Sequence, residues 1–491
     1  MSRLLTQSIN APVVLRMIGW LLMIEALFML MPVAVSAYYG EWDTVRAFAI
    51  SAGITVATGA LMTFGIRPRS SAMHKREGII LTAVVWVFFS LMGMIPLLLT
   101  GTVTTVSDAF FETMAGFTTT GASVISNLEG MTHGVLFWRA LMQWIGGMGI
   151  ILFTLAVLPM LNFKGGIALF NAEVTGITHE RLRPRVSQTA KFLWLIYVSL
   201  TALMALLLIA DMGWFDAVCH SMATLSTGGL STHDEGINYW HSPRVYIIVT
   251  AFMFVGGINF TLLYNLMRGR FSRLFHSDTF KWYLLMAVTV ATSITLWLWL
   301  HDDRELGFSA VQAAFDTVAA ITSTGYQSDV YAYHDEFVMM LLLVLMFFGG
   351  MAGSTSGGAK IDRFIVTLKN VKNEFYRVLH GNTVTAVRVD GRAIPHEIVA
   401  KVIAFLSIYL LVLGMVALML TMMGLPMADA FYTSVSTISN QGVGYGVTAA
   451  SGSFGALPDA AKWLLSFEMM VGRLELFTVL VMFTPSFWIK D

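Results

Sequence analysis

Residues 108–122 read DAFFETMAGFTTTGA, and the chain repeats this pattern three more times. The later copies are DAVCHSMATLSTGGL at 216–230, QAAFDTVAAITSTGY at 312–326 and DAFYTSVSTISNQGV at 429–443. The four copies align without a gap, and each has a glycine at the same offset: Gly121, Gly229, Gly325 and Gly442. Each copy predicts a short helix that continues into a polar turn and ends on glycine.

The composition indicates a membrane protein. The 491 residues are 56% hydrophobic and 12% charged, whereas soluble domains carry about 25% charged residues. Long apolar runs recur along the chain, as expected for transmembrane helices. The formal net charge is zero, which argues against a nucleic-acid partner, and a single cysteine, Cys219, excludes an internal disulfide.

We assign the apolar runs to ten membrane-spanning helices. Two precede the repeats, at 12–38 and 44–66, and eight flank the four repeated segments as pairs. The eight lie at 78–100, 135–160, 188–211, 243–267, 281–301, 335–349 (continuing to about 370), 396–424 and 461–487. The predicted parts are two N-terminal helices in 1–70 and repeats at 71–165, 166–275, 276–380 and 381–491.

Basic residues gather in alternate loops, which predicts the orientation. If ten helices span, the basic loops at 67–76, 164–185, 268–273 and 360–392 lie on one side, and the opposite loops are acidic. By the positive-inside rule, the basic side is cytoplasmic, and both termini share it. Each repeat contributes an even number of spans, so the four repeats are parallel.

The half-helices in the repeated segments are too short to span. About 11 residues at 1.5 Å each give about 16 Å, roughly half of the hydrocarbon core. Such a segment must enter the membrane and turn back, and irregular backbone at that depth is tolerated where it lines a water-filled or protein-buried space. The predicted fold is an all-α polytopic membrane protein, in which four parallel M1–pore helix–M2 repeats surround a central ion pore beside two N-terminal transmembrane helices.

The turns that follow the half-helices are candidate ion ligands. Glycine permits backbone angles that aim successive carbonyl groups at an axis, and rings of carbonyls can replace the hydration shell of K⁺. The alternative is that each Ser/Thr-Gly pair is an ordinary loop turn. The candidate K⁺ filter residues are Thr119, Thr120, Gly121, Thr227, Gly228, Gly229, Ser323, Thr324, Gly325, Asn440, Gln441 and Gly442.

On these residues, the chain resembles the Trk/Ktr/HKT potassium-transport superfamily, and more closely its bacterial Trk-type uptake subunits. The resemblance covers nearly the whole chain, including the two extra N-terminal helices at 12–66. It implies one essential filter glycine per repeat, and Gly121 in the first filter implies a preference for K⁺. The fourth filter, with Asn440 and Gln441, departs from the Thr-rich pattern of the others. Location in a bacterial inner membrane is also implied.

The second helix of the third repeat contains a glycine-rich break. Gly349, Gly350, Gly353, Gly357 and Gly358 surround Ser354, Thr355 and Ser356, and glycine in a helix costs about 1 kcal/mol each against alanine. The resemblance implies an intramembrane loop that obstructs the pore, so we interpret this stretch as a gate. The alternative is a close helix contact of the kind expected at Gly146-Gly147 and Gly256-Gly257.

Arg473 lies in the predicted last helix, where an intramembrane charge is expensive and usually functional. The resemblance places an arginine beside the pore below the filter. We interpret Arg473 as an electrostatic barrier that pairs with carbonyl groups of the gate loop, and the alternative is a structural pair with Glu468 or Glu475. For Arg139, near a helix end, we expect a snorkelling side chain; for Glu112 and Asp316 we expect structural hydrogen bonds.

The cytoplasmic loops predict partners. Residues 383–392 alternate in polarity and contain Asp390-Gly391, a hairpin signal that provides a docking point. The chain has no GxGxxG or P-loop motif after a strand, so nucleotide control would reside in another chain. The resemblance implies a homodimer and a peripheral Rossmann-type nucleotide-binding regulatory subunit. Attraction of the basic loops to anionic lipid of the bilayer is the alternative.

Two other function classes compete with a gated K⁺ pore. A proton-coupled potassium symporter would need a titratable relay, for which Glu112, Asp316 and Arg473 are the candidates. An intramembrane enzyme would need a convergent catalytic constellation, and the chain has no HExxH or GxSxG motif. We therefore expect a transporter that is not an enzyme and that carries K⁺ without an organic cofactor.

Overall fold

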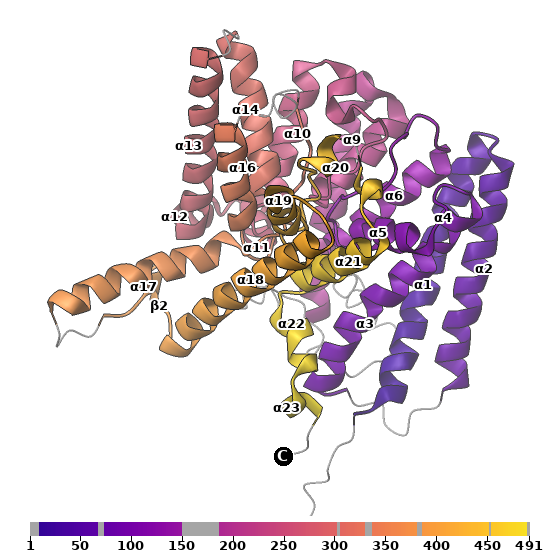
Figure 1. The fold of residues 1–491 in the computed structure, drawn as a ribbon, viewed down its shortest axis with the longest axis horizontal. Helices are drawn as coiled ribbons and strands as arrows, with labels where there is room; N and C mark the ends of the chain where they lie inside the picture. The colour runs from indigo at the N-terminus through magenta and orange to yellow at the C-terminus, as the bar shows by residue number, and fades with distance from the viewer. Residues whose placement is uncertain are drawn as a thin grey trace, which may run out of the picture.

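The computed structural model describes residues 9–66, 73–149, 186–301, 305–328, 336–380, 385–450 and 453–488. These residues are mostly α-helical, and several helices are long and apolar. The prediction of an all-α polytopic membrane protein is therefore confirmed. Figure 1 shows long helices around the outside and the shorter helices of the repeats gathered between them.

Two antiparallel helices precede the repeats, α1 (Ala11–Tyr38) and α2 (Trp42–Gly65). Their backbones touch, because a Cβ built on Gly19 would lie 2.6 Å from the carbonyl oxygen of Gly59. Small residues at a crossing point allow this close approach of helices in a membrane. The pair forms one edge of the molecule (Figure 1), and α1 joins it to the first repeat through α3 and α6.

Each repeat contributes a first long helix, a half-helix and a second helix. The first long helices are α3 (Lys75–Gly93), the initial part of α9 (Val186–Leu225), α13 (Asp278–His301) and α18 (His396–Met422). The half-helices are α5 (Val106–Phe117), the final part of α9, α14 (Leu306–Ile321) and α19 (Met427–Ile438). The second helices are α6 (His133–Gly147), α10 (Pro243–Gly256), α16 (Glu336–Phe348) and α21 (Asp459–Arg473). The two parts of α9 join at Gly213, whose φ of 78° is not helical.

Shorter elements complete the described chain. The connections within repeats contain α4 (Ile95–Leu99), η2 (Gly236–Trp240), α20 (Val447–Ala450) and η3 (Phe454–Ala456). The segments after the second helices contain α11 (Phe260–Met267), α12 (Phe271–His276), α17 (Ile361–Leu379), α22 (Phe477–Leu480), η4 (Val481–Phe483) and α23 (Pro485–Trp488). The predicted hairpin is confirmed: β1 (Arg388–Val389) and β2 (Arg392–Ala393) pair antiparallel across Asp390-Gly391.

The expectation of continuous spans is wrong for the second helices of the first, second and fourth repeats, whereas the break predicted at residue 349 in the third is confirmed. Six described helices are long and apolar enough to cross a membrane, or seven if α10 and α11 count as one bent span. All six belong to the N-terminal pair or to the first long helices. The second helices have 13 to 15 residues, about 20 Å, which is short of a hydrocarbon core of about 30 Å.

The second helices are short because each ends at, or one residue before, a residue pair that has the same position in every repeat. The pairs at the break are Gly146-Gly147, Gly256-Gly257, Gly349-Gly350 and Gly472-Arg473. A Cβ on Gly146 or Gly472 would overlap the last carbonyl groups of the half-helix in the same repeat. After the second break the chain turns away, and α10 and α11 meet at 107°. Part of the predicted 135–160 helix, from residue 150, and most of the 162–187 loop lie outside the described residues.

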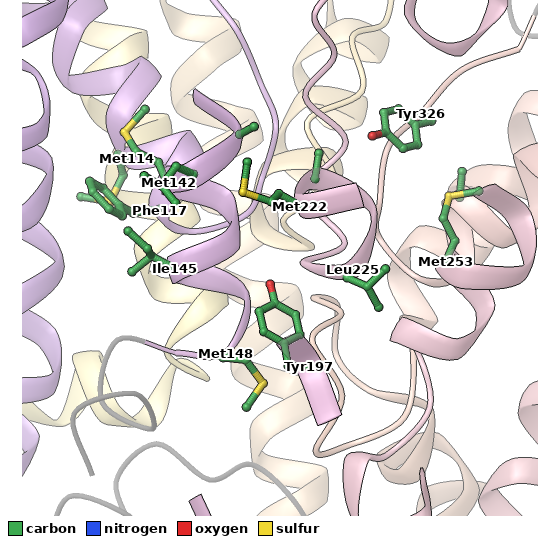
Figure 2. Close-up of a cluster of buried hydrophobic side chains, with 14 of the residues drawn as sticks. Met114, Phe117, Met142, Ile145, Met148, Tyr197, Met222, Leu225, Met253 and Tyr326 are labelled. Carbon is green, nitrogen blue, oxygen red and sulfur yellow. The ribbon is translucent and has the colours of Figure 1, made fainter. Parts of the chain in front are cut away.

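An apolar core encloses the ends of the half-helices. Figure 2 shows side chains of α5, α6, α9 and α10 packed together between the first and second repeats. Among them, Phe117, Met142 and Leu225 are fully buried. Apolar side chains therefore surround the polar turns that follow the half-helices. The main-chain groups of these turns need partners other than lipid.

Candidate functional site

The four turns at the ends of the half-helices have one backbone conformation, and we call them the ring turns: Thr118–Gly121, Ser226–Gly229, Thr322–Gly325 and Ser439–Gly442. In each, the second residue and the final glycine have positive φ. The φ values are 53–55° at Thr119, Thr227, Ser323 and Asn440 and 71–78° at Gly121, Gly229, Gly325 and Gly442. This conformation is strained for a residue with a Cβ, so its occurrence in all four turns indicates a functional constraint.

The ring turns fix their amide groups against the half-helices. In every turn the third residue donates its N–H to the carbonyl oxygen five residues earlier. The N···O distances are 2.9 Å for Thr120 to Ala115, 2.9 Å for Gly228 to Ala223, 2.9 Å for Thr324 to Ala319 and 2.8 Å for Gln441 to Ser436. Since these N–H groups point back toward the half-helices, the carbonyl groups of the same residues are free to point to the opposite side of each turn.

The four ring turns close into a single ring. Each glycine lies against the carbonyl oxygen that precedes the glycine of the next turn, so closely that an added Cβ would overlap that oxygen. The contacts run from Gly121 to Gly228, from Gly229 to Thr324, from Gly325 to Gln441 and from Gly442 to Thr120. The helices close in the same order, because α6 packs on α9, α10 on α14, α16 on α19 and α21 on α5.

The ring suits a dehydrated cation. Among the described residues, the carbonyl oxygens of Thr120, Thr324 and Gln441 accept no hydrogen bond, and that of Gly228 accepts one from Gln143. All four half-helices end at the ring, and helix C-termini carry partial negative charge. Buried carbonyl oxygens that lack donors need a cation or ordered water as partner.

The sequence 349–360, which we call the inner loop, separates α16 from α17 and contacts two ring turns and the end of the half-helix in the second repeat. Its ends meet at the base, where the Ala359 N–H donates to the Phe347 carbonyl at 3.3 Å. The contacts with the ring are Thr355 Oγ1 to the Leu225 carbonyl at 3.0 Å, the Gly357 N–H to Ser323 Oγ, and the Gly358 N–H to the Ser439 carbonyl at 2.9 Å.

The inner loop is also held by the break in the second repeat. The Met351 N–H donates to the Gly257 carbonyl at 3.0 Å, and Asn259 Nδ2 donates to the Ala352 carbonyl at 2.6 Å. Asn259 also accepts from the first N–H groups of α11, so one side chain caps a helix and fixes the loop. Three of the loop glycines, Gly349, Gly353 and Gly358, have positive φ. The loop is therefore an ordered, buried structure.

Arg473 occupies the register position of the second glycine of the other breaks and joins the first repeat to the inner loop. Its Nη1 donates to the Thr355 carbonyl at 2.7 Å, and its Nη2 donates to the carbonyls of Gly146 and Gly147 at 2.8 and 3.0 Å. The two carboxylates considered as its partners have other contacts. Glu475 pairs with Arg363, and Glu468 accepts from Ser434 and Thr437.

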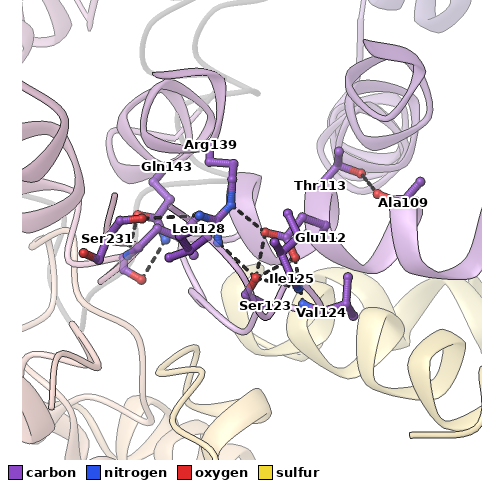
Figure 3. Close-up of polar contacts among 12 residues, drawn as sticks. Ala109, Glu112, Thr113, Ser123, Val124, Ile125, Leu128, Arg139, Gln143 and Ser231 are labelled. Carbon is purple, nitrogen blue, oxygen red and sulfur yellow. Dashed lines mark hydrogen bonds and ion pairs between the residues drawn. The ribbon is translucent and has the colours of Figure 1, made fainter. Parts of the chain in front are cut away.

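The prediction that Arg139 snorkels is wrong. Its side chain is 1% exposed, and its Nε donates to Glu112 Oε1 at 2.8 Å. The same guanidinium donates to Ser123 Oγ at 2.9 Å and to the Ser231 carbonyl of the second repeat at 3.3 Å (Figure 3). Sequence reasoning placed Arg139 near a helix end, but the long-range partner Glu112 makes burial possible, since a buried charge needs an ion pair.

Glu112 and Asp316 have structural hydrogen bonds, as expected, and they share a position that was missed. Glu112, His220 and Asp316 are each the fifth residue of the repeated segment, and each bonds the chain that leaves its ring turn. The contacts are Val124 N–H to Glu112 at 2.9 Å, His220 Nε2 with Ser231 Oγ at 3.0 Å, and Ser328 N–H to Asp316 at 3.0 Å. The gapless alignment contained this signal.

Comparisons with known proteins agree with the geometry. The model of the TrkH family, described as cation transport protein, matches residues 45–489. The Trk system potassium uptake protein TrkH of Escherichia coli K12 is 37% identical over 96% of this chain and 98% of its own length. TrkI of Halomonas elongata is 32% identical over 97% of this chain and 96% of its own. The crystal structure of the potassium transporter TrkH from Vibrio parahaemolyticus has a TM-score of 0.87 and 32% identity, and covers 98% of this chain and 100% of that chain.

Proposed function

This chain belongs to the TrkH family of cation transport proteins, and from that premise we propose that it takes up K⁺ across a bacterial inner membrane. The relatives in E. coli and H. elongata, which match this chain over nearly their full length, are named potassium uptake proteins. K⁺ is the transported ion in this proposal, and no organic cofactor takes part. The observation that carries the proposal is the closed ring of four carbonyl groups between four half-helices.

The ring turns act as the selectivity filter. Carbonyl oxygens replace the hydration shell of K⁺. The positive φ angles of Thr119, Thr227, Ser323 and Asn440 orient the carbonyl groups of each ring turn toward one side. The fourth turn has a special support, because Asn440 Nδ2 donates to Thr120 Oγ1 at 3.0 Å and to the Met469 carbonyl at 2.8 Å. Asn440 thereby ties the fourth turn to the first, which is where the ring closes.

The inner loop and Arg473 act as the gate. The loop contacts the end of the half-helix in the second repeat and the ring turns of the third and fourth, and Arg473 connects it to the first repeat, so it obstructs the path on one side of the ring. The loop is held by hydrogen bonds that can be exchanged for water, whereas a continuous helix would resist movement. Opening requires the Arg473 contact with the Thr355 carbonyl to break.

The basic loops support a gate on the cytoplasmic side. Described basic residues near this side include Arg268, Arg270 and Arg273 after α11 and the lysines of α17, and the positive-inside rule puts such loops in the cytoplasm. Both termini then lie in the cytoplasm. The half-helices enter from the opposite, outer side with their C-terminal ends directed inward.

Helix α17 is the proposed contact for a second copy of this chain. It projects away from the helical body (Figure 1) and carries an exposed apolar stripe at helical spacing. Leu368, Val371, Phe375, Val378 and Leu379 form the stripe and are 42–82% exposed. Because Cys219 is buried, Phe375→Cys supplies an accessible cysteine, and oxidation in membranes is expected to give a cross-linked dimer. A monomer band alone would exclude this interface.

A peripheral nucleotide-binding subunit is the proposed regulator. The hairpin β1–β2 lies against α17, where Lys369 Nζ donates to the Arg388 carbonyl at 2.8 Å and pairs with Asp278. A partner that pulls on this hairpin would move α17, which begins where the inner loop ends. Loss of regulator binding after deletion of residues 388–393 would support this route, and intact binding would exclude it.

Proton-coupled symport is the second candidate. Glu112 is paired with Arg139, and Asp316 accepts two bonds from Ser328, so within the described residues both carboxylates make local structural contacts, which favours the gated pore. The test is ⁸⁶Rb⁺ or K⁺ flux into proteoliposomes with and without a pH gradient and competing Na⁺. Flux that follows the K⁺ gradient, resists Na⁺ and ignores pH supports the gated pore. Flux that requires a proton gradient would replace it with symport.

A further inference from the structure

The junction between the first and second repeats differs from the other three at two positions. Four residues before the second member of each break pair, three second helices carry methionine: Met253, Met346 and Met469. The first carries Gln143 instead. The third residue of the ring turn that follows also differs, because it is Gly228 in the second repeat but Thr120, Thr324 and Gln441 in the others.

Gln143 holds both sides of the filter glycine Gly229. Its Nε2 donates to the Gly228 carbonyl at 2.7 Å, and its Oε1 accepts from the Leu230 N–H at 3.1 Å. The side chain is fully buried, and Figure 3 shows it extending from α6 toward the second repeat. One amide group therefore fixes the two peptide groups that flank Gly229.

Gln143 replaces a brace that the second ring turn lacks. In the first and third turns, the hydroxyl groups of the first and third residues are bonded, at 2.8 Å for Thr118 with Thr120 and 2.7 Å for Thr322 with Thr324. Gly228 has no side chain for this bond. A Cβ on Gly228 would overlap the amide of Gln143, so the glutamine occupies the space of the missing side chain.

We propose that Gln143 is a specificity-determining residue for the transported cation, an inference that rests on the proposed K⁺ uptake. The Gly228 carbonyl is one of the four that form the ring, and Gln143 sets both its position and the share of its lone pairs left for the ion. The contact of Arg139 with the Ser231 carbonyl, one helical turn away, holds the same stretch. The fixed spacing of this carbonyl favours K⁺ over the smaller Na⁺.

The test imports the pair found at the junction between the second and third repeats. The variants are Gln143→Met, Gly228→Thr and the double variant, which recreates the combination of Met253 with Thr324. Na⁺ competition with ⁸⁶Rb⁺ flux is measured in proteoliposomes, and the rise in Tm caused by K⁺ against Na⁺ is measured in detergent, since an ion that binds the folded state raises Tm. Met253→Leu is the matched control for side-chain replacement at this position.

We expect Gln143→Met to lose resistance to Na⁺ by about tenfold, the scale of one hydrogen bond to a group that touches the ion. Gly228→Thr alone is expected to fail by overlap with Gln143, and the double variant to recover selectivity, a non-additive result. Wild-type selectivity in Gln143→Met, or a double variant no better than either single one, would overturn the proposal. Wild-type protein without Rb⁺ flux or a K⁺-dependent Tm would instead reject K⁺ uptake itself.

Discussion

The ring turns and the layer directly inside them are built from the same four repeats, but only the ring keeps fourfold symmetry. All four ring turns share their φ angles and their contacts around the ring. In the layer inside, all four second helices break at one register, yet the third continues into the 349–360 loop and the fourth has Arg473 in place of a glycine. A site that surrounds one ion on an axis benefits from symmetry, whereas a single element that blocks the axis cannot be symmetric.

Ion binding and gating can therefore be changed separately, in the ring turns and in the layer inside them. Substitutions at equivalent ring positions should all affect ion binding, since each carbonyl contributes to one ring. Substitutions in the layer inside should differ from repeat to repeat, because each break has its own partners.

Substitution of a ring glycine should have the largest effect. Gly229→Ala and Gly325→Ala each place a Cβ on a carbonyl oxygen of the next turn. We expect K⁺ uptake to fall by about 100-fold or more, the loss that a displacement of about 1 Å causes at a preorganised site. The measurement is ⁸⁶Rb⁺ uptake. Gly414→Ala in α18, where an added Cβ meets nothing within 4 Å, is the control, and wild-type uptake by either ring variant would contradict the symmetry argument.

Removal of Arg473 should increase flux. Arg473→Ala deletes the bonds to Thr355, Gly146 and Gly147. We expect at least about tenfold higher flux, because one charge-assisted hydrogen bond contributes about 1.5–3 kcal/mol and about 1.4 kcal/mol is a factor of ten. The readout is Rb⁺ flux without a regulator, and Arg244→Ala, an exposed residue, is the control. Unchanged flux would show that the inner loop does not limit conduction.

Replacement of three buried tyrosines in the first long helices should reduce the stability of the protein to different extents. Tyr197 donates to the Trp144 carbonyl at 2.9 Å and Tyr283 to the Phe254 carbonyl at 3.1 Å. In the described residues, the Tyr409 hydroxyl has no partner. Replacement by phenylalanine should cost about 1 kcal/mol at Tyr197 and Tyr283 and nothing at Tyr409. Thermal unfolding in detergent measures these differences. An equal loss of stability for Tyr409→Phe would contradict the view that this hydroxyl, unlike those of Tyr197 and Tyr283, has no bond to the preceding second helix.

The smallest effect is expected at Asp234, in the loop that follows the second ring turn. Burial raises the pKa of Asp234, and its hydrogen bond with Glu129 raises it further, whereas that bond lowers the pKa of Glu129 to about 2. The stabilising contribution of Asp234 is thus present below its unfolded pKa of about 3.9 and is lost as pH rises through its higher folded pKa. That of Glu129 is present above about 4.3 and is lost as pH falls through about 2.

Asp234→Asn removes the first of these two dependences. Its Tm should exceed that of wild type by about 1–2 °C at pH 7 and match it below pH 4, on the usual scale of Tm for small changes. Differential scanning fluorimetry from pH 3 to pH 8 measures the difference. A constant offset at all pH values would assign the effect to a cause other than this carboxyl pair.

The repeats were readable from sequence, and their closure was not. The alignment of the four segments predicted the half-helices, the ring turns and the glycine-rich break at 349–358, because each is a local pattern. The shortness of the other second helices was missed. Gly256-Gly257 looks like a helix contact in isolation, and the chain breaks there because Met351 and Thr355, about 95 residues away, bond to its carbonyls.

Buried charges gave the second kind of miss. Arg139 reads as a residue at a helix end until Glu112 is known to face it at 2.8 Å. The same alignment could have revealed that Glu112, His220 and Asp316 share one position. In contrast, the pairing of Gln143 with Gly228 joins two different repeats, and a comparison within one repeated segment does not contain it.

The most direct measurement is the position of a bound cation in the ring. Crystals grown in Rb⁺ allow anomalous scattering to locate the ion without reference to the protein. We expect an anomalous peak on the axis among the carbonyl oxygens of Thr120, Gly228, Thr324 and Gln441, and its loss when Gly229 is replaced by alanine. A peak beside Glu112 or Asp316, or an empty ring with bound Rb⁺ elsewhere along the path, would contradict it.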